Sequence, residues 1–113
     1  MGKKERKEKG KRSSEDEFLV PNPEEGTILC IVTRIVGAGW VDVFCTDGKQ
    51  RRARIPGKLR RRMWMRERDV VLVSVWEFRD DRGDVIYRYT RDEKERLIKE
   101  GYLDPEFLEI EEF

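Results

Sequence analysis

The stretch RIPGKLRRRMWM (Arg54–Met65) ends one predicted strand and begins a connector. Pro56-Gly57 stops the strand, because proline cannot donate a ladder hydrogen bond and glycine favours a turn. Residues 58–65 lack the alternation of apolar and polar side chains that is typical of strands, and they are fair helix formers. We therefore predict a short helix or turn at this point, between two strands of a β domain.

Three segments before this connector have the composition of strands. The first two, Gly26–Val36 and Trp40–Cys45, are rich in β-branched residues and are separated by glycines. Asp47-Gly48, a strong hairpin signal, leads into the third segment, Gln50–Ile55. The first segment is apolar on both faces, which is typical of a central or strongly curved strand.

Two further strands and a helix are predicted after the connector. Asp69–Phe78 is the clearest strand of the sequence, and Val85–Tyr89 gives a fifth, with DDRGD (residues 80–84) as a loop between them. Arg91–Gly101 is predicted to form a helix, because Thr90 can cap it, acidic residues fill its first turn and a glycine ends it.

Five strands with a small connector between the third and fourth fit a five-stranded OB-fold Greek-key barrel. We expect an all-β fold with a short helix between strands 3 and 4 and a C-terminal helix packed on the barrel. An SH3-like barrel is the alternative, but the position of the connector and the length of the first strand favour the OB fold. The expected division is a flexible basic arm (1–17), an OB-fold domain (18–90), the helix (91–101) and a mobile acidic tail (102–113).

Several classes of protein are disfavoured by the composition. The sequence contains no histidine, so Ser–His and Cys–His catalytic pairs and a Cys/His zinc site are excluded. No glycine-rich phosphate loop occurs either, and we predict no enzyme activity, no metal and no cofactor. Without a long apolar run or a secretory signal, we expect a soluble, cytoplasmic monomer. Cys30 and Cys45 are expected to be reduced core residues, with a disulfide between adjacent strands as the less favoured alternative.

The net charge of +1 conceals a strong segregation of charge along the chain. Residues 1–12 hold seven basic side chains against two acidic ones, a balance of +5. Residues 49–68 hold ten against one, a balance of +9, whereas residues 92–113 hold three against nine, a balance of −6. A basic arm and a basic middle indicate a polyanionic partner for these two parts of the chain.

The central basic stretch is dominated by arginine, which binds phosphates and also stacks on nucleic acid bases. Trp64, within it, is either a stacking plate for an unpaired base or a core residue that anchors the connector. Trp40 and Phe44 lie outward on their predicted strand and either stack on bases or contact the C-terminal helix, whereas Trp76 is expected in the core. The basic candidates for RNA contacts are Arg51, Arg52, Arg54, Lys58, Arg60, Arg61 and Arg62.

RIPGKLRRRMWM resembles the signature of archaeal translation initiation factor 1A. The similarity extends through FCTDGKQRRARI before it, and through DVVLVSVWEF and GDVIYRYTRDEKERLIKEGYL after it, over roughly residues 18–104. The resemblance implies an S1-like OB fold that binds ribosomal RNA at the A site of the small ribosomal subunit. It also implies that the protein promotes binding of initiator methionyl-tRNA and mRNA, keeps the subunits apart and cooperates with other initiation factors.

The resemblance also assigns site residues. The family's ribosomal RNA contacts map onto Lys58, Arg60, Arg61, Arg62 and Trp64, with Arg52 and Arg54 on the adjoining strand, and favour base stacking for Trp64. The basic N-terminal tail of the family corresponds in charge to a segment that contains Lys3, Lys4, Lys7, Lys11 and Arg12. Trp40, Phe44 and Arg51 remain additional candidates. The alternatives are a general single-stranded RNA-binding protein or RNA chaperone, and an adaptor that binds proteins through its acidic C-terminal end.

Overall fold

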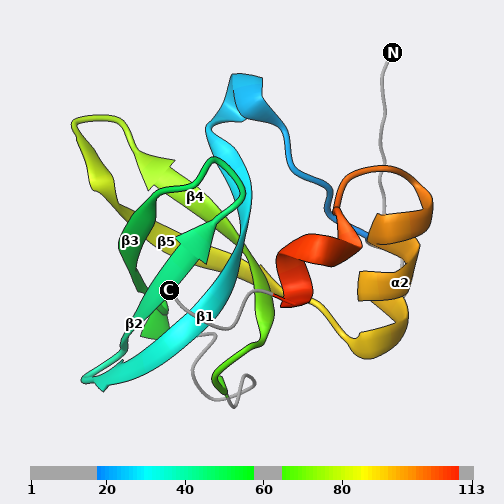
Figure 1. The fold of residues 1–113 in the computed structure, drawn as a ribbon. Coiled ribbons are helices and arrows are strands. Elements are labelled where there is room, and N and C mark those ends of the chain that lie inside the picture. Colours follow the sequence, from blue (N-terminus) through cyan, green and yellow to red (C-terminus); the bar gives the residue numbers. More distant parts are fainter. Residues whose placement is uncertain (1–17, 58–64, 110–113) are drawn as a thin grey trace.

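The computed structural model describes residues 18–57 and 65–109 and shows a closed barrel of five strands (Figure 1). The strands are β1 (Thr27–Gly37), β2 (Trp40–Cys45), β3 (Gln50–Arg54), β4 (Val70–Trp76) and β5 (Arg79–Arg88). They are accompanied by the helix α2 (Arg91–Lys99) and by two short 3-10 helices, η3 (Pro23–Glu25) and η4 (Pro105–Glu109).

The order of the strands around the barrel is β1-β2-β3-β5-β4, and β1 closes it by pairing with both β2 and β4. Neighbouring strands are antiparallel, except that β3 and β5 pair in parallel. This is the Greek-key arrangement of the OB fold, so the fold expected from the sequence is confirmed. The predicted short helix between strands 3 and 4 falls on residues 58–64, which lie outside the described part of the chain.

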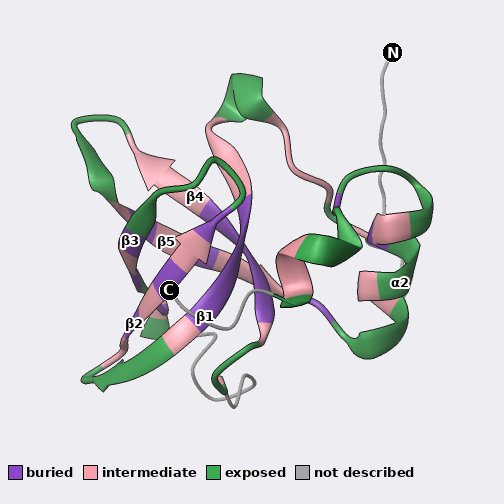
Figure 2. Ribbon diagram, in the orientation of Figure 1, coloured by how far each residue is buried: buried purple, intermediate pink, exposed green. Residues whose placement is uncertain are grey.

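Two apolar clusters hold the fold together, and β1 contributes to both of them. Its inward side chains, such as Val32, pack inside the barrel against Val43, Val73 and other small β-branched residues. Its outward Leu29 packs on the opposite side of the strand, in a second cluster that includes Leu97 of α2. Figure 2 shows buried residues concentrated in the strands. The apolar character of both faces of the first predicted strand is thereby explained.

The helix α2 is fixed at its first turn and docks on the barrel by one side. The hydroxyl of Thr90 accepts a hydrogen bond from the backbone N–H of Glu93, whose carboxylate accepts one from the N–H of Thr90, a complete capping box. Leu97 is fully buried, and Gly101 ends the segment with a left-handed φ of 87°. The predicted helix and its packing on the barrel are confirmed, with its last turn at Lys99 rather than Gly101.

The acidic C-terminal segment packs against the rest of the protein over the residues described, 102–109. Leu103 is buried, and the ring of Phe107 stacks on Phe44 of β2 with centroids 5.8 Å apart. The carbonyl oxygen of Leu108 also accepts a hydrogen bond from Arg68. Residues 102–109 therefore contact the rest of the protein through a few apolar side chains, whereas residues 110–113 lie outside the described part of the chain.

The connection between β4 and β5 is tighter than the sequence suggested. The chain turns at Glu77 and Phe78, so residues 80–84, expected to be a loop, belong to β5. The Gly-Asp signal marks an irregularity in the strand pairing instead, since Gly83 lies where β5 passes very close to β4. Trp76, expected in the core, is only half-buried at the outward end of β4.

Replacing Gly83 by alanine is expected to lower the free energy of unfolding by about 1–3 kcal/mol. A Cβ at this position would lie 2.5 Å from Cγ1 of Val73 and 2.8 Å from the carbonyl oxygen of Ser74, so the two strands would have to separate. Urea unfolding followed by circular dichroism measures the loss. The neighbouring Arg82→Ala change serves as the control and should cost within about 0.5 kcal/mol; equal stability of the two variants would contradict the argument.

The two cysteines form a disulfide rather than remaining reduced, which corrects the expectation from the sequence. Cys30 and Cys45 lie directly opposite each other in the antiparallel pair of β1 and β2, with their Cα atoms 3.9 Å apart. Both side chains point into the barrel and are fully buried. The alternative of a cross-strand disulfide, less favoured on grounds of compartment, is the one that the structure shows.

Candidate nucleic-acid interface

A row of charged side chains crosses the outer face of four strands. Arg34 of β1 faces Asp42 of β2, Asp42 faces Arg52 of β3, and Arg52 faces Arg82 of β5. These residues line an open cleft of about 710 Å³, together with Thr33 and Gln50 among others. We call this feature the arginine cleft. The register of the barrel thus gathers arginines from three strands that are far apart in the sequence.

The guanidinium groups of the cleft are held in place by carboxylates. Asp42 binds two of them, with Oδ1 2.8 Å from Nε of Arg52 and Oδ2 3.1 Å from Nη2 of Arg34. The hydrogen bond from Arg52 and the nearby positive charges lower the pKa of Asp42 below its ordinary value, so it stays ionised. Arg34 keeps 63% of its side chain exposed. Such partly paired, oriented arginines can still offer free N–H groups to a phosphate.

Arg54 continues this surface along β3, at the next outward position after Arg52. Its Nε lies 3.2 Å from Oδ1 of Asp84, and 54% of its side chain is exposed. Arg54 faces Trp40 across β2 and β3. The basic segment 58–64 begins directly after Gly57. Two sets of predicted site residues lie outside the described part of the chain: Lys58, Arg60, Arg61, Arg62 and Trp64 in this segment, and Lys3, Lys4, Lys7, Lys11 and Arg12 near the N-terminus.

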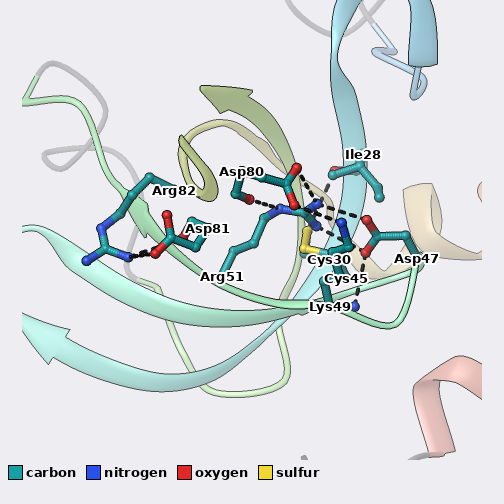
Figure 3. A network of polar contacts seen from close by, with 9 residues as sticks. All are labelled: Ile28, Cys30, Cys45, Asp47, Lys49, Arg51, Asp80, Asp81 and Arg82. Atoms are coloured by element: carbon teal, nitrogen blue, oxygen red, sulfur yellow. Dashed lines mark hydrogen bonds and ion pairs between the residues drawn. A yellow bond between two sulfur atoms is a disulfide. The ribbon is translucent and has the colours of Figure 1, made fainter. Parts of the chain in front are cut away.

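Arg51 is different from its neighbours, because its side chain lies on the inward side of β3 and only 3% of it is exposed. Its guanidinium donates two hydrogen bonds to the carboxylate of Asp47, at 3.1 and 2.9 Å, and others to the carbonyl and carboxylate oxygens of Asp80 (Figure 3). The hydrogen bond to Asp47 raises the pKa of Arg51 further. Arg51 is therefore a structural residue that joins two turns, with its guanidinium bound by oxygens of Asp47 and Asp80.

The other additional candidates divide in the same way. Phe44 stacks on Phe107 of η4, so it contacts the C-terminal segment, but this contact is not with the helix that the prediction named. Trp40 remains half-buried on the outer face, with its ring edge-on to Trp76 at 6.3 Å. Sequence reasoning missed Arg34 and Arg82, because the first lies in an apolar strand and the second in the expected loop. Only the strand register brings them to the cleft.

Comparison with known proteins identifies the family of this chain. A family model described as Translation initiation factor 1A / IF-1 matches residues 15–112. The chain belongs to this family. The match to the initiation factor 1A family includes the whole barrel, the arginine cleft and segment 58–64, and it confirms the resemblance to archaeal translation initiation factor 1A.

Individual relatives of the initiation factor 1A family agree over most of the chain. Translation initiation factor 1A of Aeropyrum pernix is 52% identical over 101 residues, which is 89% of this chain and 91% of that protein. The proteins of the same name from Saccharolobus islandicus and Saccharolobus solfataricus are 49% identical over 90 residues, covering 80% of this chain and 83% of theirs. A solution structure of translation initiation factor 1 from the Wolbachia endosymbiont of Brugia malayi has a TM-score of 0.46 and 24% identity, covering 64% of this chain and 85% of that one.

The described residues contain neither a membrane-spanning helix nor a metal-binding cluster of side chains. No helix within residues 18–57 and 65–109 is long and apolar enough to cross a membrane. Over the same residues, no group of three or more cysteine, aspartate or glutamate side chains is arranged to hold a metal ion.

Proposed function

We propose that the protein is a translation initiation factor that binds ribosomal RNA at the A site of the small ribosomal subunit. In this proposal it acts in the cytoplasm as a monomer, promotes binding of initiator methionyl-tRNA and mRNA, favours dissociation of the subunits and cooperates with other initiation factors. It has no catalytic role. Membership in the initiation factor 1A family supports the general role, and the sites follow from the arrangement of its basic residues.

The observation that carries the proposal is the continuity of the arginine cleft with the basic segment. Arg52 and Arg54 occupy successive outward positions of β3, and only three residues separate Arg54 from segment 58–64. That segment carries Lys58, Arg60, Arg61, Arg62 and Trp64 in the sequence. In this proposal the cleft and the segment together neutralise several phosphates, and Trp64 provides a ring for a base to stack on.

Replacing Arg60, Arg61 and Arg62 together by alanine is expected to weaken binding to isolated small subunits by about tenfold or more. The slope of log affinity against log salt should fall by about 2–3 units, because about one counterion is released for each phosphate that is neutralised. The measurement is co-sedimentation of the protein with purified small and large archaeal ribosomal subunits, over a salt series and with unstructured RNA as competitor.

A matched control removes the same number of positive charges from the helix α2. Arg91, Lys94 and Lys99 lie on α2, which is on the far side of the barrel from β2 and β3 (Figure 1). The variant with all three replaced by alanine should bind small subunits like the wild type. Equal losses in the two triple variants would show that net charge, and not this face, controls binding.

The general RNA-binding alternative predicts a different selectivity. An RNA chaperone should bind small subunits, large subunits and unstructured competitor about equally, whereas the initiation factor should keep its preference for small subunits in the presence of competitor. The adaptor alternative predicts that deleting residues 102–113 abolishes binding and that the arginine variant retains it. The role with initiator tRNA is tested by adding the protein to small subunits with mRNA and measuring the amount of initiator methionyl-tRNA retained.

A further inference from the structure

Three aromatic rings lie side by side at the outer end of the barrel, beyond the arginine cleft. The ring centroid of Trp76 in β4 lies 6.3 Å from that of Trp40 in β2, in an edge-to-face arrangement. It also lies 6.3 Å from the ring centroid of Phe78, in the turn that follows β4. Trp40 and Trp76 are half-buried, whereas 86% of Phe78 is exposed. We call Trp40, Trp76 and Phe78 the aromatic ledge.

The position of the ledge is fixed by one carboxylate. Oδ2 of Asp84 accepts a hydrogen bond of 3.2 Å from the indole Nε1 of Trp76, while its Oδ1 accepts one of 3.2 Å from Nε of Arg54. Arg54 is in turn the cross-strand partner of Trp40. Strand pairing and this shared carboxylate therefore hold the indoles of Trp40 and Trp76 close to the guanidinium of Arg54.

Folding alone does not explain why Phe78 is aromatic. It lies in a tight turn, where small or polar residues are usual, and with 86% of its surface exposed it contributes little to either apolar cluster. An exposed aromatic side chain next to two half-exposed tryptophans forms an apolar patch of the kind that marks an interaction site.

The surroundings of the ledge favour unpaired RNA bases over an apolar protein surface as the partner. Trp76 shares the carboxylate of Asp84 with Arg54, and its Cα partner in the pairing of β4 with β5 is Arg79, whose guanidinium binds Asp81. Aromatic rings next to guanidinium groups suit a single-stranded RNA, in which bases alternate with phosphates. The ledge also continues the arginine cleft, because Arg52 and Arg54 occupy successive outward positions of β3.

We infer that the aromatic ledge is a stacking site for unpaired bases of an RNA strand whose backbone runs along the arginine cleft. The inference rests on the proposed function, because it assumes that this face binds RNA. It adds a second stacking surface, built from residues other than Trp64. Phe78 is its most exposed member and the residue through which it is tested.

The test measures the affinity of the full chain for a 12-nucleotide unstructured RNA and for the same ribose-phosphate chain without bases, by fluorescence anisotropy. Phe78→Ala is expected to weaken binding of the base-bearing strand at least about fivefold and to leave the salt slope unchanged. Phe78→Tyr should restore the affinity. Binding of the strand without bases should be the same in all these proteins.

Tyr102→Ala is the matched control, because Tyr102 is an exposed aromatic residue outside the ledge. Trp40→Leu gives a second variant at the other end of the ledge and should weaken the base-bearing strand in the same way. Unchanged affinity in both ledge variants, or an equal loss on the strand without bases, would overturn the inference. A failure of this kind would not affect the proposed function, provided that the protein still binds small subunits selectively. If the ledge variants weaken RNA binding as expected but the wild type shows no preference for small subunits, the proposed function is overturned instead.

Discussion

Replacing both Cys30 and Cys45 by alanine is expected to lower the free energy of unfolding by about 3 kcal/mol. The disulfide closes a loop with a sequence separation of 15 residues, and cross-linking a loop of this length restricts the unfolded chain by about that amount. The two residues face each other inside the barrel, where both are fully buried. The cross-link therefore joins β1 to β2 at the centre of the fold and not at a frayed edge.

Urea unfolding of the wild type with and without a strong reductant measures this contribution directly. The reduced wild type should unfold near the midpoint of the double variant, and the mass of the untreated protein should be two hydrogens below that of the fully reduced chain. Single Cys30→Ala and Cys45→Ala variants provide the control, because each loses the cross-link and keeps one thiol. A midpoint that does not respond to reductant would contradict the prediction.

The disulfide illustrates the part of the fold that the sequence could not predict. Strand composition, turn residues and helix caps are local signals, and they were sufficient for five strands, the barrel and α2. Whether Cys30 and Cys45 meet depends on the register of β1 against β2, since a shift by one residue would point one of them outward. This register is set by the packing of the whole barrel, so it depends on residues from all the strands and cannot be read from one short stretch of sequence.

The candidate site shows the same limit. Arg52 and Arg54 could be placed outward from their alternation with Ala53, but Arg34 and Arg82 reach the cleft only through pairings with distant strands. The β4–β5 turn was misplaced because Gly83 resembles a turn glycine, although its role is to permit close approach of two strands. The apolar run of β4 predicts Trp76 in the core, whereas the structure leaves it half-buried at the end of that strand.

Replacing Arg51 by alanine is expected to lower the free energy of unfolding by about 3 kcal/mol, the low end for a broken buried ion pair. The low end applies because Asp47 and Asp80 keep 34% and 62% of their side chains exposed and can be solvated once Arg51 is lost. Arg51 itself ties the β2–β3 turn to the start of β5, so its removal should loosen two neighbouring turns at once.

Arg52→Ala is the matched control, since it removes the same side chain from the next position of the same strand. Arg52 is outward, with 39% of its side chain exposed, and its pairing with Asp42 should contribute little to stability because solvent screens it. The two variants should therefore have opposite consequences. Arg51→Ala should unfold at lower urea and bind RNA normally while folded, whereas Arg52→Ala should keep the stability and lose part of the affinity.

The pH dependence of the Arg51→Ala effect distinguishes an ionic contribution from simple loss of packing. The hydrogen bond from Arg51 lowers the pKa of Asp47, so this interaction stabilises the fold fully above about pH 4, the ordinary value for aspartate. It is lost as the pH falls through the lowered pKa, because protonated Asp47 no longer attracts the guanidinium. The stability difference between wild type and Arg51→Ala should therefore shrink below about pH 4, as measured by urea unfolding at each pH. A difference that stays constant down to strongly acidic pH would assign the effect of Arg51 to packing of its aliphatic stem.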